Sequence, residues 1–242
     1  MSPRSAVIAA LACLAIGLTG CAGTPSTKTI NIPIPASSRL QLTCTALKSA
    51  LLPLSDFPPG YQIDTRGTQD SGPTLVSGTT APAPQNCPQM IKATNYPTAG
   101  LTAGVIEFLD DTTIDHRSIH HQRSFDERIY QFATTSGSTG YFDLVRSMTS
   151  HCLSVTERVG AATMVFKQMA SLATPVAGHE ALLVRGSTTI GGANAVSIDL
   201  YVIDGTDVYV VGSSVVGVPL IAQPSSLAAL MAKLIVRVQA IG

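Results

Sequence analysis

The densest set of side chains that could do chemistry lies between Asp110 and Arg128. Its acidic and histidine residues are Asp110, Asp111, Asp115, His116, His120, His121, Asp126 and Glu127. His116 and His120 are four residues apart, so on a helix they would share one face and could bind one zinc or copper ion. The sequence favours a solvated connection between two strands instead, because no glutamate stands between the histidines as in a metalloprotease helix. We therefore expect no metal site and no cofactor.

Nucleophilic catalysis has no recognisable motif in this chain. There is no Gly-x-Ser-x-Gly elbow, and no Ser-x-x-Lys precedes a Ser-Asp-Asn or Lys-Thr-Gly partner. A Ser–His–Asp triad is recognised by geometry, so counting residues does not decide whether one forms. His179 could serve as a base, but its position in Ala177-Gly178-His179-Glu180, just before a predicted strand, favours a turn residue. The chain is therefore expected to have no catalytic residues and not to be an enzyme.

A short apolar segment at the N-terminus ends in Leu18-Thr19-Gly20-Cys21, which matches a bacterial lipobox. Arg4 precedes it, and the stretch from Ala6 to Leu18 has the length of the apolar part of a signal peptide. We predict a lipoprotein signal peptide at residues 1–20 and diacylglycerol attachment to Cys21, whose freed amino group then takes a further acyl chain such as palmitate. Two or more acyl chains bind a membrane stably, so the protein is expected on the extracytoplasmic side of the cell membrane. The alternative is an ordinary secreted protein.

The amino-acid composition limits which classes of partner the protein can bind. The 242-residue chain has a formal net charge of zero and only 12% charged residues, so it offers no basic field for nucleic acid. Its 45% apolar content, rich in Val, Ile and Ala together with Thr and Gly, indicates a sheet-rich domain. Residues 21–41 are rich in Thr, Ser and Pro and are predicted to be a flexible tether after the lipidated cysteine. The folded extracytoplasmic domain is predicted over 42–242.

Periodicity predicts the elements of that domain. Amphipathic spacing indicates a short helix ending before Pro53, a helix over Ser138–Ser150 and a C-terminal helix capped by Ser225. Residues Arg66–Gln85 are predicted to be a long loop. Alternating or β-branched runs predict strands at Tyr61–Thr65, Ala103–Leu109, Arg128–Ala133, Leu153–Val159, Thr163–Met169, Ala181–Ile190, Ala195–Ile203 and Asp207–Ser214. The predicted class is α+β, an antiparallel sheet with helices packed against it and an amphipathic C-terminal helix.

Besides the lipidated Cys21, the mature chain has three cysteines, Cys44, Cys87 and Cys152, in a compartment where disulfides form. We favour a bond between Cys87 and Cys152, because each lies at a helix boundary and Cys152 continues a buried helix face. A bond between Cys44 and Cys87 is the main alternative. Closing a loop of about 65 residues contributes roughly 4 kcal/mol in the chain-entropy model.

Several short motifs resemble one family. They are Leu51-Leu52-Pro53-Leu54-Ser55-Asp56-Phe57-Pro58-Pro59-Gly60-Tyr61, Asn86-Cys87-Pro88, the aromatic-bearing helix ending in Cys152, Gly178-His179-Glu180-Ala181, Val184-Arg185 and the strand pair around Asp204-Gly205. With them the chain resembles lipoproteins of mycobacteria and related actinobacteria that carry a domain similar to the extracellular sensor of PknH-type serine/threonine kinases. The resemblance implies an antiparallel sheet with a cleft thought to bind a ligand, and no established catalytic reaction. Those sensors use two disulfides, of which three cysteines can retain at most one.

The sequence therefore favours a lipid-anchored, non-catalytic envelope protein whose sensor-like outer domain binds an apolar ligand or an envelope protein partner. A cell-wall or lipid hydrolase without a recognisable motif is one alternative. A structural or host-facing surface lipoprotein is another. An apolar pocket under the C-terminal helix would favour the first hypothesis, although a filled core is the usual outcome for such residues.

Overall fold

The computed structural model describes residues 41–65, 69–71, 86–95, 97, 100–113, 122–152, 155–159, 162–172, 175–190, 193–217 and 223–242. The predicted signal peptide, Cys21, nearly all of the predicted tether, Asp115 and the histidines at 116, 120 and 121 lie outside the described residues.

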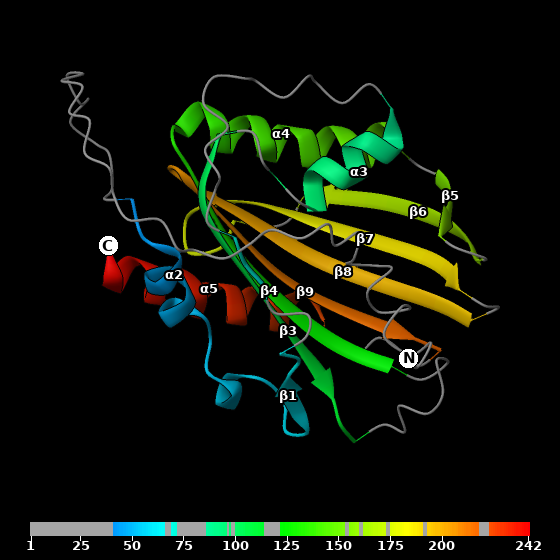
Figure 1. Ribbon diagram of the computed structural model, residues 1–242, viewed down its shortest axis with the longest axis horizontal. Coiled ribbons are helices and arrows are strands. Elements are labelled where there is room, and N and C mark those ends of the chain that lie inside the picture. Colours follow the sequence, from blue (N-terminus) through cyan, green and yellow to red (C-terminus); the bar gives the residue numbers. More distant parts are fainter. Residues whose placement is uncertain are drawn as a thin grey trace.

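One antiparallel sheet organises the described part of the chain (Figure 1). Its strand order is β1-β3-β4-β9-β8-β7-β6-β5, and β2 also pairs with β3. The strands are β1 (Tyr61–Ile63), β2 (Gln69–Ser71), β3 (Leu101–Asp111), β4 (Gln122–Phe132), β5 (Val155–Val159), β6 (Ala162–Leu172), β7 (Glu180–Ile190), β8 (Ala193–Asp204) and β9 (Asp207–Val216). The chain connections bring β9 between β4 and β8, so the middle of the sheet joins segments far apart in sequence.

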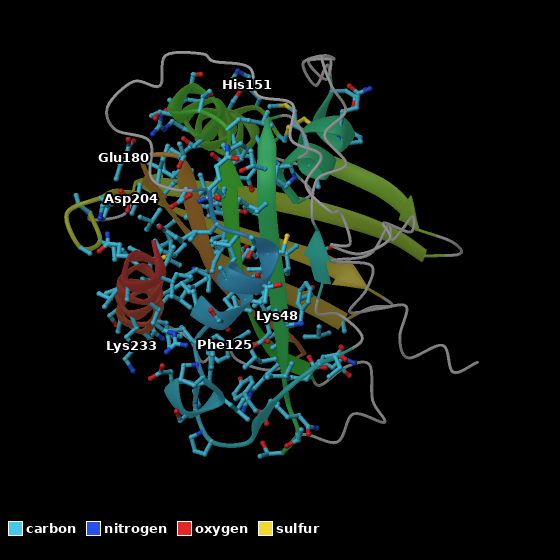
Figure 2. The ribbon with its side chains drawn as sticks, turned by 60° about the vertical axis from the view of Figure 1, so that its left-hand side comes forward. Lys48, Phe125, His151, Glu180, Asp204 and Lys233 are labelled. Carbon is cyan, nitrogen blue, oxygen red and sulfur yellow. A yellow bond between two sulfur atoms is a disulfide. The ribbon has the colours of Figure 1, made fainter. Side chains whose placement is uncertain are left out.

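Helices lie on both faces of this sheet (Figure 1). Helices α2 (Cys44–Ala50) and α5 (Pro224–Ile241) lie on one face, together with the short η1 (Leu54–Asp56). Helices α3 (Cys87–Asn95) and α4 (Thr135–His151) lie on the other. Lys233 of α5 donates to Asp56 at 2.6 Å and so joins α5 to η1 (Figure 2). The predicted α+β class with a C-terminal helix is confirmed.

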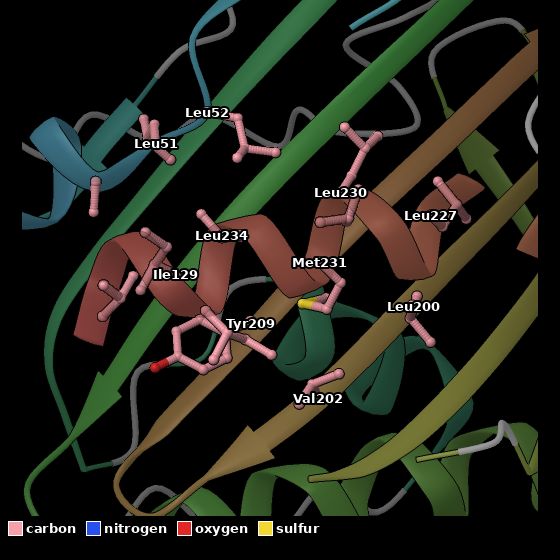
Figure 3. Packing of buried hydrophobic residues seen from close by; sticks show 14 of the residues in the cluster. Leu51, Leu52, Ile129, Leu200, Val202, Tyr209, Leu227, Leu230, Met231 and Leu234 are labelled. Atoms are coloured by element: carbon pink, nitrogen blue, oxygen red, sulfur yellow. The ribbon is translucent and has the colours of Figure 1, made fainter. Parts of the chain in front are cut away.

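The larger core lies under α5 (Figure 3). Leu227, Met231 and Leu234 of α5 are fully buried against Leu200 and Val202 of β8 and the strands beside it. Close packing of this kind is the usual state of an interior and favours the filled-core interpretation over an apolar pocket. By length and composition α5 is also the one helix among the described residues that could span a membrane. Its apolar side is used by the core instead.

Aromatic side chains dominate the core under α4. Tyr141 of α4 packs with its ring 5.6 Å from Tyr130 and 5.5 Å from Phe132, both on β4. The Tyr141 hydroxyl donates to the Thr94 carbonyl at 2.6 Å, which ties α3 to α4. Burial of the three rings, with the Tyr141 hydroxyl hydrogen-bonded, makes this a stable packing unit.

Three sequence predictions need correction. Strand β2 forms inside the segment predicted to be a loop over Arg66–Gln85. Helix α5 begins at Pro224 with Gln223 as its N-cap, so Ser225 lies within the first turn, because proline fits the first helical position. The segment Asp110–Arg128 is not one solvated connection, since β3 extends through Asp111 and β4 begins at Gln122.

Two buried polar side chains of β4 bind the segments on either side of α2 to the sheet. Gln131 Oε1 accepts the Leu42 N–H at 2.6 Å, and both carboxyl oxygens of Glu127 accept the Leu52 N–H, at 3.0 and 3.1 Å. Arg237 of α5 donates to the carbonyls of Ala50 and Ser49 at the end of α2, at 2.9 and 3.0 Å. Helix α2 is thus fastened at both ends by long-range hydrogen bonds.

Glu127 is completely buried, and its pKa is raised from 4.5 to about 8. Burial is the largest cause, the Leu52 N–H lowers the pKa, the neighbouring Glu107 raises it and Arg237 lowers it. Glu107 stands directly opposite Glu127 on β3. Because the folded pKa exceeds the unfolded one, this carboxyl favours the folded state fully below pH 4.5, and that contribution is lost as the pH rises through about 8.

We therefore expect the free energy of unfolding of the native chain to fall between pH 6 and pH 8 by up to roughly 1.4 kcal/mol per pH unit. Glu127→Gln keeps an oxygen for the Leu52 N–H but cannot ionise, so its stability should fall less steeply than that of the native chain. The difference should be clearest between pH 7 and pH 8, above the raised pKa of Asp199. Urea unfolding at several pH values measures the difference. Glu180→Gln, at an exposed carboxylate, is the control and should follow the native chain. An equal decline in E127Q would show that another group carries the pH dependence.

Candidate functional site

Charged side chains interrupt the α4 face of the sheet beside the aromatic core. Asp126 of β4, Gly212 of β9 and Asp199 of β8 stand in one cross-strand row, because Asp126 pairs with Gly212 and Gly212 pairs with Asp199. Arg128 lies two residues from Asp126 on the same face. We call Asp126, Arg128 and Asp199 the arginine cluster.

Arg128 links the two carboxylates of the arginine cluster. Its Nε donates to Asp126 Oδ2 at 2.7 Å, and its Nη2 lies 3.6 Å from Asp199 Oδ1. The side chains of Arg128, Asp126 and Asp199 are 14%, 11% and 16% exposed, so solvent still reaches all three. A group of charges that is mostly removed from water yet still accessible can bind a ligand from solution.

Gly212 has no side chain where the two carboxylates converge. A Cβ at this position would lie 2.5 Å from Asp126 Oδ1 and 2.5 Å from Asp199 Oδ1, so the two oxygens are within twice that distance of each other. The glycine is required here by space, since both carboxylates lean over its backbone.

Burial and neighbouring charges shift the pKa values in the cluster. The pKa of Asp199 is raised to about 7, first by burial and then by Asp126, while Arg128 lowers it. Burial lowers the pKa of Arg128, but Asp126, Tyr130 and Asp199 outweigh it and hold that pKa well above its ordinary value. Burial also raises the pKa of Tyr201 and Tyr141, so both phenols stay protonated. Asp199 is the member of the cluster that can change charge near neutral pH.

Three serines form the next row of the same face, and we call them the serine row. Ser124 of β4 pairs with Ser214 of β9, which pairs with Ser197 of β8, and Gly186 of β7 follows. The hydroxyl oxygens of Ser124 and Ser214 are 2.6 Å apart. The arginine cluster and the serine row together make a continuous polar area across three central strands.

The predicted disulfide residues lie away from this area. Cys87 at the start of α3 and Cys152 after α4 are joined in a disulfide, with Cα atoms 5.5 Å apart. Cys44 is buried in the core under α5 and takes no part in that bond. The disulfide fixes α3 on α4, and α4 covers the aromatic half of the face.

Other candidates from the sequence are not assembled into a site. His179 lies in the turn before β7, as predicted, and its Nδ1 is 3.5 Å from Asp204 Oδ1. His151 contacts Ser147 and Ser150 at the exposed end of α4 (Figure 2). Within the described ranges, no group of three or more His, Cys, Asp or Glu side chains could hold a metal ion. The arrangement supports binding through charge and hydrogen bonds.

Comparison with known proteins places the fold. No family model and no curated protein matches the chain. The extracellular domain of PknH from Mycobacterium tuberculosis is structurally similar, with a TM-score of 0.55 at 12% identity over 82% of this chain and 97% of that one. A putative uncharacterized protein from Mycobacterium smegmatis, an Rv0999 ortholog, gives a TM-score of 0.42 at 10% identity over 81% and 96% of the two chains. The likeness to the PknH domain shows a shared fold.

Gly212→Ala should disturb the arginine cluster, because the added methyl group meets two carboxylate oxygens that Arg128 holds in place. We expect a loss of about 1–3 kcal/mol in the free energy of unfolding, measured with urea. Gly140→Ala is the matched control, since an added Cβ there meets nothing within 4 Å and alanine favours the helix. Equal stability of the two variants would mean that the two carboxylates move aside for the methyl group at no cost in stability.

Proposed function

We propose that this chain is a lipid-anchored protein of the cell envelope whose extracytoplasmic, sensor-like domain binds a ligand or a partner and is not catalytic. Residues 1–20 would be the signal peptide, 21–41 the lipidated cysteine and tether, and 42–242 the binding domain. The arginine cluster carries the proposal, because it is an accessible set of charges in the middle of the sheet, beside the apolar cores under α4 and α5.

The energetics of buried charge support binding over a purely structural role. Replacing a buried ion pair by apolar residues of similar size is often neutral or stabilising by about 1–4 kcal/mol. Val208, Val210 and Leu182 show that the same face is built from apolar residues where α4 covers it. The stability of the fold therefore does not require charges at Asp126, Arg128 and Asp199, which favours ligand recognition as their role.

Three observations support the proposed location. The lipobox ending in Cys21 is a feature of the sequence, and the fold is shared with a domain that is extracellular in PknH. A disulfide between Cys87 and Cys152 suits an oxidising compartment. A lipid anchor on Cys21 would hold the domain at the outer side of the membrane.

Acylation of Cys21 can be tested by metabolic labelling with palmitate. The native chain should take up label, and Cys21→Ala should take up none and lose its stable membrane attachment, because two acyl chains supply most of the membrane affinity. Cys13→Ala is the matched control, since that cysteine lies within the predicted signal peptide and should not affect labelling. Label on C21A, or none on the native chain, would refute the anchor.

Ligand or partner binding can be tested by native mass spectrometry of the protein purified from its own source. The native chain should carry an additional mass beyond its lipid, and Asp199→Asn should lose it, because one charge of the arginine cluster is removed without changing side-chain size. Asp143→Asn, at an exposed carboxylate on α4, is the control and should keep the bound mass. Loss in both variants, or no bound mass in the native chain, would contradict binding at this site.

A further inference from the structure

We propose that the ligand of the polar area is cationic and carries amine hydrogen-bond donors. This inference rests on the proposed function and names the chemical class that the arginine cluster and the serine row would recognise.

Charge is the first argument. Asp110 of β3 stands opposite Ser124, so it adds a third carboxylate beside Asp126 and Asp199 on this face. Arg128 is the one cation among the side chains described in this row and its two neighbouring rows, and both of its charged contacts are to Asp126 and Asp199. The area therefore has a negative balance once the aspartates are ionised. An anion would meet three carboxylates and an arginine whose charge is already compensated.

Hydrogen-bond capacity is the second argument. Gln122 of β4 and Thr188 of β7 lie at the two ends of the row after the serine row, on the same face. They are 7% and 4% exposed, and their Oε1 and Oγ1 atoms have no hydrogen-bond partner. An unpartnered amide oxygen accepts only, so a ligand that offers hydrogen-bond donors would satisfy it.

Hydroxyl groups complete the match. Serine oxygens can accept as well as donate, and the serine row lies between the carboxylates and the two unpartnered groups. An ammonium group has three donors and no acceptor, so it suits a surface of carboxylate, amide and hydroxyl oxygens that accept hydrogen bonds. A neutral polyol would provide donors but no charge, and a carboxylate ligand would provide no donor and a charge of the wrong sign.

The test is calorimetric titration of the mature chain in detergent with three probes of similar size: ethanolamine, ethylene glycol and acetate. Ethanolamine should bind at least tenfold more tightly than either other probe. Asp199→Asn should weaken ethanolamine binding about tenfold, and the exposed control Asp143→Asn should leave it unchanged. Thr188→Val, which removes one unpartnered hydroxyl with little change in volume, provides a second variant should D199N fail to fold.

The alternative results are distinguishable. Tighter binding of ethylene glycol or acetate that is weakened by D199N would overturn the cationic class and leave the proposed binding site intact. Ethanolamine binding that neither D199N nor T188V weakens, or no binding by any probe, would overturn this inference and also the arginine cluster as the binding site.

Discussion

Strand β4 lies between two helical layers, and this position decides what its charged side chains can do. Residues along a strand alternate between faces, so Glu127 and Gln131 lie under α2 and α5 while Asp126 and Arg128 lie on the α4 side. None of the eleven residues from Gln122 to Phe132 is exposed. Any charge on this strand therefore has to be paired, hydrogen-bonded or neutralised.

The two faces of β4 meet this requirement in different ways. On the α4 face, Arg128 pairs with both Asp126 and Asp199. On the α5 face, Glu127 holds the Leu52 N–H with a carboxyl that burial keeps protonated at neutral pH. The two solutions are coupled, because the charge of the adjacent Asp126 is one of the causes that raise the pKa of Glu127. A change of charge at Asp126 therefore shifts the pKa of Glu127 on the opposite face.

Much of the fold could be predicted from local sequence. The alternation in β8 correctly separated Ile198, Leu200 and Val202, which pack under α5, from Asp199 and Tyr201, which lie on the α4 face. The start of β4 could not be predicted, because Gln122–Arg128 is rich in charge and its apolar residues are too few to show the two-residue period. Burial of those charges depends on partners far along the chain.

The candidate site could not be predicted from the sequence for the same reason. Asp126, Asp199 and Gly212 are separated by up to 86 positions and meet only through the register of β4, β9 and β8. The sequence offered one signal, a polar alternation at Ser197 and Asp199 between the apolar residues of the middle of β8. Local patterns do not show which strands become neighbours, so the converging carboxylates above Gly212 required the structure.

The attachment of Leu42 and Leu52 to β4 has a mechanical consequence. If the chain is tethered upstream of Leu42, tension from the envelope enters the domain at the Gln131 hydrogen bond and is passed through α2 to Glu127 and Arg237. That load path runs along the α5 side of the sheet. The arginine cluster, on the reverse side, would keep its geometry while the anchor is pulled.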